Sequence, residues 1–192
     1  MVIKKGEKRD QDEILQQLSL PLFVKPNRGG SSVGTSKVQT AEELMPAIDL
    51  AFNEDSQVIL EEHIPGRELS CGTINFKGEI RTLPVTEIIS KKEFFDYEAK
   101  YQGMSEEVTP ANIAESVAQN ISKTSLKLYG LLNCKGMVRF DYILNGNDLF
   151  FLEVNTVPGM SELSIVPQQA LKAGISLRDL FTETMLNALK SR

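Results

Sequence analysis

The feature that most constrains the fold of this chain is a pair of apolar segments separated by a short polar turn. Residues 138–144 and 149–154 are largely apolar, and Asn145-Gly146-Asn147-Asp148 lies between them. Asn-Gly and similar polar pairs favour the tight turns of β-hairpins. The two segments therefore predict an antiparallel hairpin, and helical periods elsewhere in the chain indicate a mixed α and β fold.

Polar residues recur within this hairpin at a spacing of two. Arg139 and Asp141 lie on the first predicted strand, and Glu153 and Asn155 lie on the second. Side chains at positions i and i+2 share one face of a strand. A loop of odd length would place Asp141 opposite Glu153 and Arg139 opposite Asn155. An even loop without a bulge would put the two pairs on opposite faces.

If they gather on one face, these groups predict a site for a hard cation. Two carboxylates and one amide oxygen suit Mg²⁺, which retains water and takes phosphate oxygens as further ligands, and they suit zinc poorly. The alternative is a ladder of surface salt bridges. The apolar surroundings of Glu153 and Asn155, within residues 149–155, argue against that alternative, because an uncompensated carboxylate there would be costly.

A second polar constellation is the Gly/Ser-rich stretch at residues 27–34, which follows Lys25. Glycine lets backbone N–H groups approach phosphate oxygens because no Cβ blocks the way. Lys25, at the end of the preceding predicted strand, can add a positive charge. The stretch is not a P-loop, in which the lysine follows the last glycine and a helix follows directly. The alternative interpretation is an ordinary hairpin loop.

Three further segments carry weaker signals. Residues 61–64, together with Glu68, could contact a purine and a ribose, or they could form an exposed acidic strand end. Residues 94–101 mix aromatic and charged side chains, as in a lid over a charged ligand or a solvated loop with an aromatic anchor. Residues 158–164 could offer backbone N–H and hydroxyl donors to an anionic substrate, or they could be a plain connection.

Composition narrows the functional classes. The 192 residues carry a net charge of −5, which argues against a dedicated nucleic-acid binder. No apolar run approaches the ~18 residues that span a membrane. The single histidine, His63, argues against a His-based zinc site. Cys71 and Cys134 are predicted to be reduced thiols, so we expect a cytoplasmic protein.

Helix signals occur at three places. Thr40 and Glu43 form a capping box before an apolar period. A second helix is predicted to begin at Thr109-Pro110, and Ser176 is predicted to cap the last one. The apolar positions expected to face inward on the last helix are Leu177, Phe181, Met185 and Leu189.

Taken in order, these segments resemble the D-alanine–D-alanine ligases, a family of the ATP-grasp superfamily. The matching stretches run in the family's order from residue 20 onward, and they are LFVKPNRGGSSVGTSKV, VILEEHIPGRELS, FFDYEAKY, CKGMVRFDYIL and FFLEVNTVPGMSELSIVP. The EAKY and NTxPGM segments are specific to this ligase group. Tyr101 matches the dipeptide-forming pattern rather than that of ester-forming relatives.

The resemblance implies an α+β ATP-grasp fold with two α+β lobes and antiparallel sheets. We expect residues 1–19 to form a leading strand–helix segment, in which Val2-Ile3 has no evident partner nearby. Residues 20–89 would form the smaller, nucleotide-binding lobe. Residues 90–192 would form the larger lobe, with a mobile loop at 90–109 and the metal site. The family's N-terminal α/β domain has no counterpart here, so we expect a C-terminal part of a ligase.

The resemblance also implies roles in binding ATP and metal. The residues expected at the phosphates are Lys25, Ser31, Ser32 and Val33. Those expected at the adenine are Glu61, Glu62, His63 and Ile64, and Glu68 would bind the ribose hydroxyls. Asp141, Glu153 and Asn155 would hold two Mg²⁺ ions, for which Mn²⁺ could substitute.

The implied reaction joins two D-alanine molecules through an acyl phosphate. Arg139 and the Gly159 N–H would stabilise the tetrahedral oxyanion, and Ser164 would hold the carboxylate of the second substrate. Lys100 and Tyr101 would close the site, and Ser31 would assist at the phosphates.

The partners implied are ATP and D-alanine, with no nucleic acid and no membrane, and the full-length protein would be a homodimer. We expect the 192 residues alone to turn over little. Two alternatives stay open. One is another ATP-grasp ligase with a different substrate, and the other is an ATP-binding module without catalysis.

Overall fold

The computed structural model describes residues 1–90 and 105–190, and it divides the chain into two compact units. The first unit comprises residues 1–64, and the second comprises residues 65–89 and the chain from residue 105 onward. The predicted boundary at residue 89 differs from this division. The reason is that residues 67–74 pair with residues 137–144, which makes them part of the sheet of the second unit.

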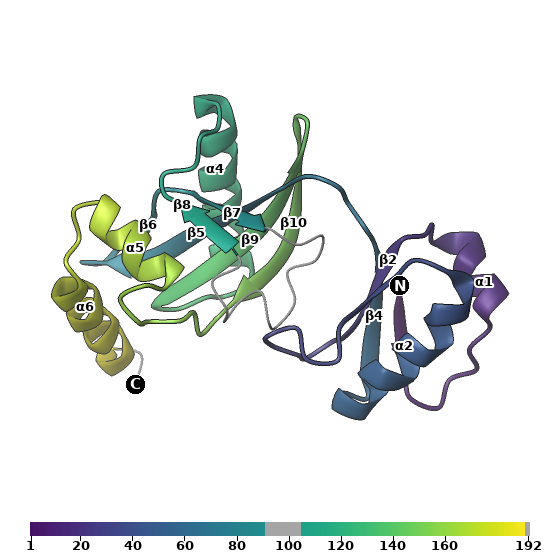
Figure 1. Cartoon of the computed structure of the whole chain (residues 1–192). Coiled ribbons are helices and arrows are strands. Elements are labelled where there is room, and N and C mark those ends of the chain that lie inside the picture. Colours follow the sequence, from purple (N-terminus) through teal and green to yellow (C-terminus); the bar gives the residue numbers. More distant parts are fainter. Residues whose placement is uncertain (91–104, 191–192) are drawn as a thin grey trace. The chain divides into compact units, whose positions relative to one another are not determined.

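The first unit is a four-stranded antiparallel sheet with two helices (Figure 1). Its strands lie in the order β1-β4-β2-β3. Val2-Ile3 pairs with residues 58–59, so the leading strand does have a partner, although it lies far along the chain. The elements are β1 (Val2–Lys4), α1 (Gln11–Gln17), β2 (Leu22–Pro26), β3 (Ser36–Val38), α2 (Ala41–Glu54) and β4 (Gln57–Glu62).

Helix α2 covers this sheet with the apolar face that its sequence predicts. The carboxylate of Glu43 accepts hydrogen bonds from the backbone N–H groups of Gln39 (2.7 Å) and Thr40 (3.3 Å), as in the predicted capping box. Such contacts satisfy N–H groups that lie outside the helical hydrogen bonds. The helix buries Leu44, Ala47, Ile48, Ala51 and Phe52 in one core with β1, β2, β3 and β4.

The second unit is built on a six-stranded sheet in the order β10-β9-β5-β7-β8, with β6 also on β5. The pairings of β5 with β6, β7 and β9, and of β9 with β10, are antiparallel. Strand β5 contacts β9 along one edge and both β7 and β6 along the other. The elements are β5 (Arg67–Phe76), β6 (Glu79–Thr82), β7 (Thr86–Ser90), β8 (Ser105–Val108), α4 (Glu115–Leu131), β9 (Met137–Asn145), β10 (Asp148–Asn155), α5 (Ile165–Lys172) and α6 (Leu177–Lys190).

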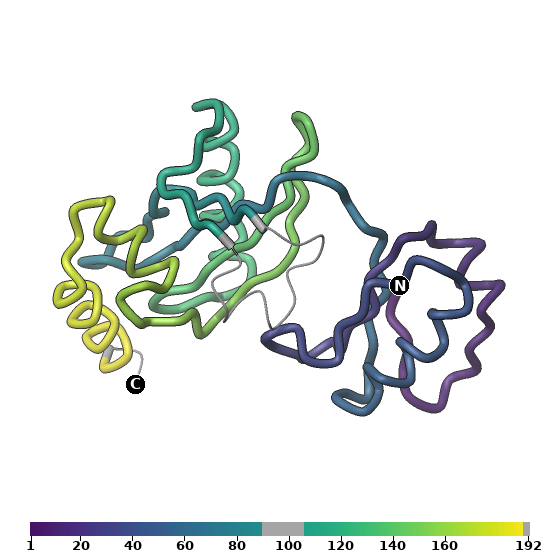
Figure 2. The backbone as a smooth tube through the Cα atoms, in the orientation of Figure 1, coloured from purple at the N-terminus to yellow at the C-terminus, as the bar shows by residue number. Residues whose placement is uncertain are grey.

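Different helices cover the two faces of this sheet, and the backbone path can be followed in Figures 1 and 2. On one face, Leu69, Cys71, Phe140 and Tyr142 pack with Ile121 and Tyr129 of α4. On the other, Ile74 and Phe76 pack with residues of α5 and α6. Because side chains alternate along a strand, the α5 face also carries Ser70, Gly72, Arg139 and Asp141.

Helix α4 begins at Glu115 rather than directly after Thr109-Pro110. The backbone N–H of Ala111 donates to the Val85 carbonyl (2.7 Å), which holds this stretch against the chain before β7 instead of in a helix. Ser105–Val108, within the loop predicted at residues 90–109, forms strand β8. Residues 91–104 of that loop lie outside the described residues.

The predicted inward face of α6 is wrong at three positions. Phe181, Met185 and Leu189 are 40%, 60% and 67% exposed, whereas Leu180 is buried. The side of α6 that meets the sheet makes polar contacts, because Glu183 accepts from the Lys77 N–H and Asn187 donates to the Asn75 carbonyl. Polar contacts with backbone groups of the β5–β6 hairpin, together with the packing of Leu180, therefore set the orientation of this helix.

Two expectations from composition can be compared with the structure. Both cysteines are free thiols, as predicted, with Cys71 buried and Cys134 partly exposed. Across residues 1–90 and 105–190, the helices are too short or too polar for any of them to cross a membrane.

The environment of the two thiols predicts a difference in reactivity. Burial raises the pKa of Cys71 to about 11, and it also raises the pKa of Cys134. At pH 8 about one Cys71 thiol in a thousand would be the reactive thiolate, and reagent would have to reach it inside the core. We expect iodoacetamide to modify Cys134 at least about tenfold faster than Cys71, as measured by mass spectrometry. In urea the two rates should become similar, and equal rates in the folded protein would contradict this assignment.

Candidate active site

The hairpin of β9 and β10 brings the four predicted polar residues to one face. Its turn contains two residues, an even number, because Asp148 pairs with Asn145. Regular pairing beyond such a turn would send Glu153 to the α4 face. A bulge between Phe151 and Glu153 takes up one extra residue and changes the register. Beyond the bulge, the facing pairs are Glu153 with Asp141 and Asn155 with Arg139.

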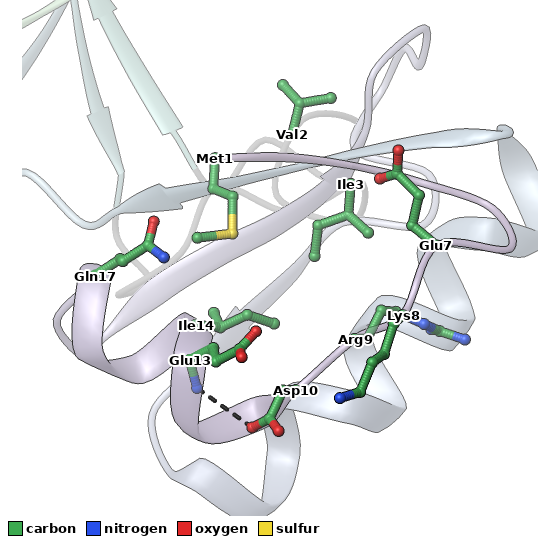
Figure 3. A pocket seen from close by; sticks show the side chains of 10 residues that line it. All are labelled: Met1, Val2, Ile3, Glu7, Lys8, Arg9, Asp10, Glu13, Ile14 and Gln17. Atoms are coloured by element: carbon green, nitrogen blue, oxygen red, sulfur yellow. Dashed lines mark hydrogen bonds between the residues drawn. The ribbon is translucent and has the colours of Figure 1, made fainter.

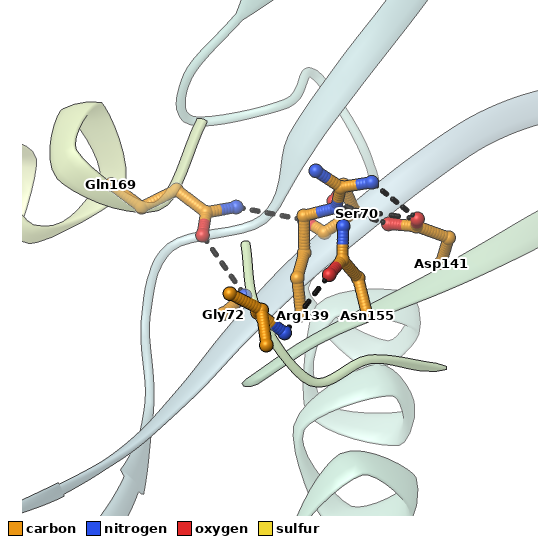
Figure 4. Close-up of polar contacts among 7 residues, drawn as sticks. Ser70, Gly72, Arg139, Asp141, Asn155 and Gln169 are labelled. Carbon is orange, nitrogen blue, oxygen red and sulfur yellow. Dashed lines mark hydrogen bonds and ion pairs between the residues drawn. The ribbon is translucent and has the colours of Figure 1, made fainter. Parts of the chain in front are cut away.

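The Asp141 carboxylate is the most buried charged group of this face, with a side chain that is 4% exposed. The Arg139 guanidinium donates to both of its oxygens, from Nε to Oδ1 (2.9 Å) and from Nη2 to Oδ2 (2.8 Å). The Ser70 hydroxyl donates to Oδ1 at 2.7 Å (Figure 4). A buried carboxylate is tolerated when it is paired and hydrogen-bonded in this way.

Several carboxylates stabilise the positively charged form of Arg139. Burial by itself would lower the pKa of Arg139, but the hydrogen bonds and charge of Asp141 outweigh it, and the charges of Glu153 and Glu68 add to the effect. The net result is a pKa above the ordinary value. Glu68 lies on β5 opposite Ile143, and its charge therefore acts on Arg139 together with the charges of Asp141 and Glu153.

The donor set of this face fits a hard cation that keeps part of its water. Within the described residues, no group of three or more His, Cys, Asp and Glu side chains is arranged to hold a metal. Asp141, Glu153 and Asn155 offer two carboxylates and one amide, a set that Mg²⁺ completes with water and phosphate oxygens. The Asn155 Oδ1 already accepts from the Val157 N–H (3.1 Å), which orients the amide.

In the first unit, the Gly/Ser stretch forms the connection from β2 to β3. Ser31 and Ser32 have φ values of 52° and 59°, and Gly34 has 69°, so the chain turns through left-handed conformations there. The Val33 N–H donates to the Gly30 carbonyl (3.1 Å). The loop is thus a series of tight turns, which is the backbone form that can present N–H groups to an anion.

Lys25 and Glu61, predicted at the phosphates and the adenine, form an ion pair across β2 and β4. Glu62 instead accepts from the Ser19 N–H at 2.7 Å and so fixes the chain before β2. The His63 ring packs on Phe23, with ring centres 5.8 Å apart, and burial together with the charge of Lys37 lowers the pKa of His63.

The segment before α5 holds two more predicted residues close together. A Cβ on Gly159 would lie 2.9 Å from the Ser164 Oγ, so the glycine permits this approach. The Ser164 hydroxyl also shares a hydrogen bond with the Ser161 hydroxyl (2.8 Å), and Ser164 is the residue that precedes α5. Lys100, Tyr101 and the predicted lid at residues 94–101 lie outside the described residues.

Sequence reasoning missed two residues of the second unit, Ser70 and Gln169 (Figure 4). Both are completely buried, and both hydrogen-bond at or next to Asp141. A signal existed for each, because Ser70 lies between the apolar residues Leu69 and Cys71, and Gln169 lies on the buried side of α5.

Two cavities of the described residues lie away from the predicted site. One, of about 190 Å³, lies in the first unit and is lined by residues 1–3, 7–10, 13, 14 and 17 (Figure 3). Another, of about 330 Å³, lies beside α4 and the tip of the β9–β10 hairpin. Neither is lined by a residue predicted to act in binding or catalysis.

Comparison with known families decides where the chain belongs. The family model described as "D-ala D-ala ligase C-terminus" matches residues 1–186. The chain belongs to this family. The prediction of an α+β ATP-grasp fold with antiparallel sheets is confirmed, since solved D-alanine–D-alanine ligases share it over the whole chain.

Individual relatives give the extent of the likeness. The D-alanine–D-alanine ligase of Flavobacterium johnsoniae is 48% identical over 95% of this chain and 57% of its own length. The crystal structure of the Bacillus anthracis ligase matches with a TM-score of 0.84 and 34% identity, over 100% of this chain and 61% of that one. The same ligase complexed with ATP matches with a TM-score of 0.82 and 30% identity, over 100% and 60%. The chain thus spans a little over half the length of these relatives.

The hydrogen bond from Ser70 to Asp141 predicts a measurable loss of stability. Ser70→Ala would leave a buried carboxylate with one donor fewer, and hydrogen bonds to charged groups contribute about 1.5–3 kcal/mol. Ser125→Ala is the matched control, because it removes an equally short bond (2.7 Å) between Ser125 and Tyr142, two neutral groups on the opposite face. We expect that control to cost about 0.5–1.5 kcal/mol in urea unfolding. A larger loss in the control would argue against a charge-assisted bond at Asp141.

Proposed function

We propose that this chain is the ATP- and metal-binding part of a D-alanine–D-alanine ligase that makes a peptidoglycan precursor. The observation that carries the proposal is the convergence of Arg139, Asp141, Glu153 and Asn155 on one face of the β9–β10 hairpin. Membership of the ligase family and the ATP complex of a relative support it.

The acidic face would bind two Mg²⁺ ions, with Mn²⁺ as a substitute. Asp141, Glu153 and Asn155 would be the protein ligands, and the metal would neutralise the phosphate oxygens of ATP. Because Arg139 and Ser70 already use both oxygens of Asp141, a cation there would compete with the guanidinium for the carboxylate.

The residues proposed to contact the nucleotide are those that the sequence predicts. The tight turns at Ser31, Ser32 and Val33 would present backbone N–H groups to the phosphates, and the Ser31 hydroxyl would assist there. Lys25, which forms an ion pair with Glu61, would add its positive charge at the phosphates. The residues proposed for the adenine are Glu61 and the backbone of Glu62, His63 and Ile64, and Glu68 is proposed for the ribose hydroxyls.

The proposed reaction has two steps. The carboxylate of one D-alanine attacks the γ-phosphorus of ATP, which gives an acyl phosphate and releases ADP. The amine of a second D-alanine attacks the carbonyl carbon, loses a proton, and phosphate leaves. Arg139 and the Gly159 N–H would stabilise the oxyanion between attack and departure. Ser164 would hold the carboxylate of the second D-alanine. Lys100 and Tyr101 would close the site at the phosphates.

The setting of the whole protein is part of the proposal. We propose a homodimer that acts in the cytoplasm, where ATP is available and free thiols such as Cys71 and Cys134 persist. A second candidate is an ATP-binding module without turnover. Another ATP-grasp ligase with a different amino acid or hydroxy acid is the alternative within enzymes.

A coupled assay for ATP-dependent phosphate release separates these functions. We expect a protein that contains the whole ligase to release phosphate with D-alanine and little with other amino or hydroxy acids. The 192 residues alone should release little or none while still binding ATP in calorimetry. If the 192 residues released phosphate as fast as the whole ligase, the expectation that turnover needs further residues would be wrong. Preference for a different substrate would identify a different ligase.

The proposed metal site predicts a specific defect in ATP binding. Glu153→Gln should weaken Mg²⁺-dependent ATP binding at least about tenfold, because it removes one of two anionic ligands. Asp148→Asn, at the start of the same strand, removes an exposed charge away from the site and should leave binding unchanged. Calorimetric titration with and without Mg²⁺ makes the comparison. Equal binding by Glu153→Gln and the unaltered chain would remove Glu153 from the site.

A further inference from the structure

Strand β5 has a short gap along one edge. It pairs with β7 through residues 68–70 and with β6 through residues 73–76, so that Cys71 and Gly72 have no strand partner on this side. The Gly72 carbonyl accepts from the Leu83 N–H (2.8 Å), whereas the Gly72 N–H points into the gap. A buried N–H in such a position requires an acceptor from elsewhere in the molecule.

The side chain of Gln169 on α5 fills this gap as a peptide group would. Its Oε1 accepts from the Gly72 N–H (2.9 Å), and its Nε2 donates to the Ser70 carbonyl (2.9 Å) and to the Thr86 hydroxyl (2.9 Å). The residue is completely buried, and both amide hydrogens and the oxygen are used. A Cβ at position 72 would lie 2.6 Å from Oε1, so glycine is what admits the amide.

The gap lies next to the Asp141 carboxylate. Ser70 is held at its carbonyl by Gln169, and with its hydroxyl it donates to Asp141 Oδ1, as Figure 4 shows. The other donor to this carboxylate is Arg139, which pairs with Gly72 across β5 and β9. One donor to Asp141, Ser70, thus lies at a β5 position that the amide holds, and the other, Arg139, lies on β9 opposite Gly72, the second such position.

Gln169 also belongs to the element that follows the predicted substrate segment. It lies on α5, which starts directly after Ser164, and that serine touches Gly159. This side chain therefore links α5, which begins after Ser164, to the part of β5 that contacts Asp141.

We propose that Gln169 is a positioning residue of the site, which holds β5 at Ser70 and Gly72 and thereby fixes the Asp141 carboxylate relative to α5. The expected effect on metal binding rests on the proposed function. Its geometric part concerns contacts within the second unit and can be measured without metal.

Gln169→Met tests the proposal, since it keeps the length of the side chain and removes all three hydrogen bonds. Tyr142→Phe is the matched control, because it removes the buried bond to Ser125 on the opposite face of the same sheet. Gln169→Glu is the second variant, for use if methionine prevents folding, since it keeps the acceptor for Gly72 and loses both donors. All measurements use the 192-residue chain well below the unfolding temperature of each variant.

The first measurement is NMR exchange of the Gly72 amide and the Arg139 Nε–H in the chain without metal. We expect exchange of both to accelerate about tenfold or more in Gln169→Met and to stay unchanged in Tyr142→Phe, since each proton is covered by the contacts described. Unchanged exchange of the Arg139 Nε–H in the Gln169 variant would overturn the proposal, because Asp141 would then be held without the amide.

The second measurement is the Mg²⁺ concentration that half-saturates ATP binding. Loss of an outer hydrogen-bonding partner of a metal ligand weakens metal binding by about 10–100-fold. Ser70 is such a partner of Asp141 and is held by Gln169, so we expect a shift toward this size in Gln169→Met and none in Tyr142→Phe. A purely structural role would lower the stability of both variants and leave both midpoints in place, which would also overturn the proposal. If the unaltered chain shows no Mg²⁺-dependent binding, the proposed function fails, while the exchange measurement still decides the positioning role.

Discussion

The burial of the Asp141 carboxylate is the constraint on which the second unit depends. A charge removed from water must be paired and hydrogen-bonded, or the fold loses several kcal/mol. Arg139 supplies the opposite charge from the same strand, and Ser70 supplies a hydroxyl from the neighbouring strand. These requirements place charged and polar residues on the α5 side of the sheet, next to the apolar cluster that contains Ile74, Val166 and Ala170.

Much of this arrangement could be predicted from the sequence because it depends on local spacing. The hairpin around residues 146–147, the capping box of α2 and the shared face of Arg139 and Asp141 all follow from patterns within a few residues. The facing of Glu153 and Asp141 could be stated only as a condition on the loop. Leu152 looks like any apolar strand residue, so nothing in the pattern showed that it would be taken up by a bulge.

The parts that could not be predicted depend on partners distant in sequence. The strand at Val2-Ile3 finds β4, and residues 67–76 join the second sheet rather than the first. The orientation of α6 is set by polar contacts of Glu183 and Asn187 with a hairpin more than 100 residues away, which apolar periodicity does not report. Gln169 belongs to the same class, since its partners are backbone groups of β5.

The bulge in β10 has a consequence for how this hairpin can vary among relatives. Residues 142–152 separate the two facing carboxylates, and they are odd in number, whereas regular pairing around a two-residue turn accommodates an even number. A lineage that lost Leu152 would keep Glu153 opposite Asp141 in an unbulged hairpin. Gain or loss of that single residue is therefore neutral for the facing pair, so one-residue length differences at this point need not signal a change of chemistry.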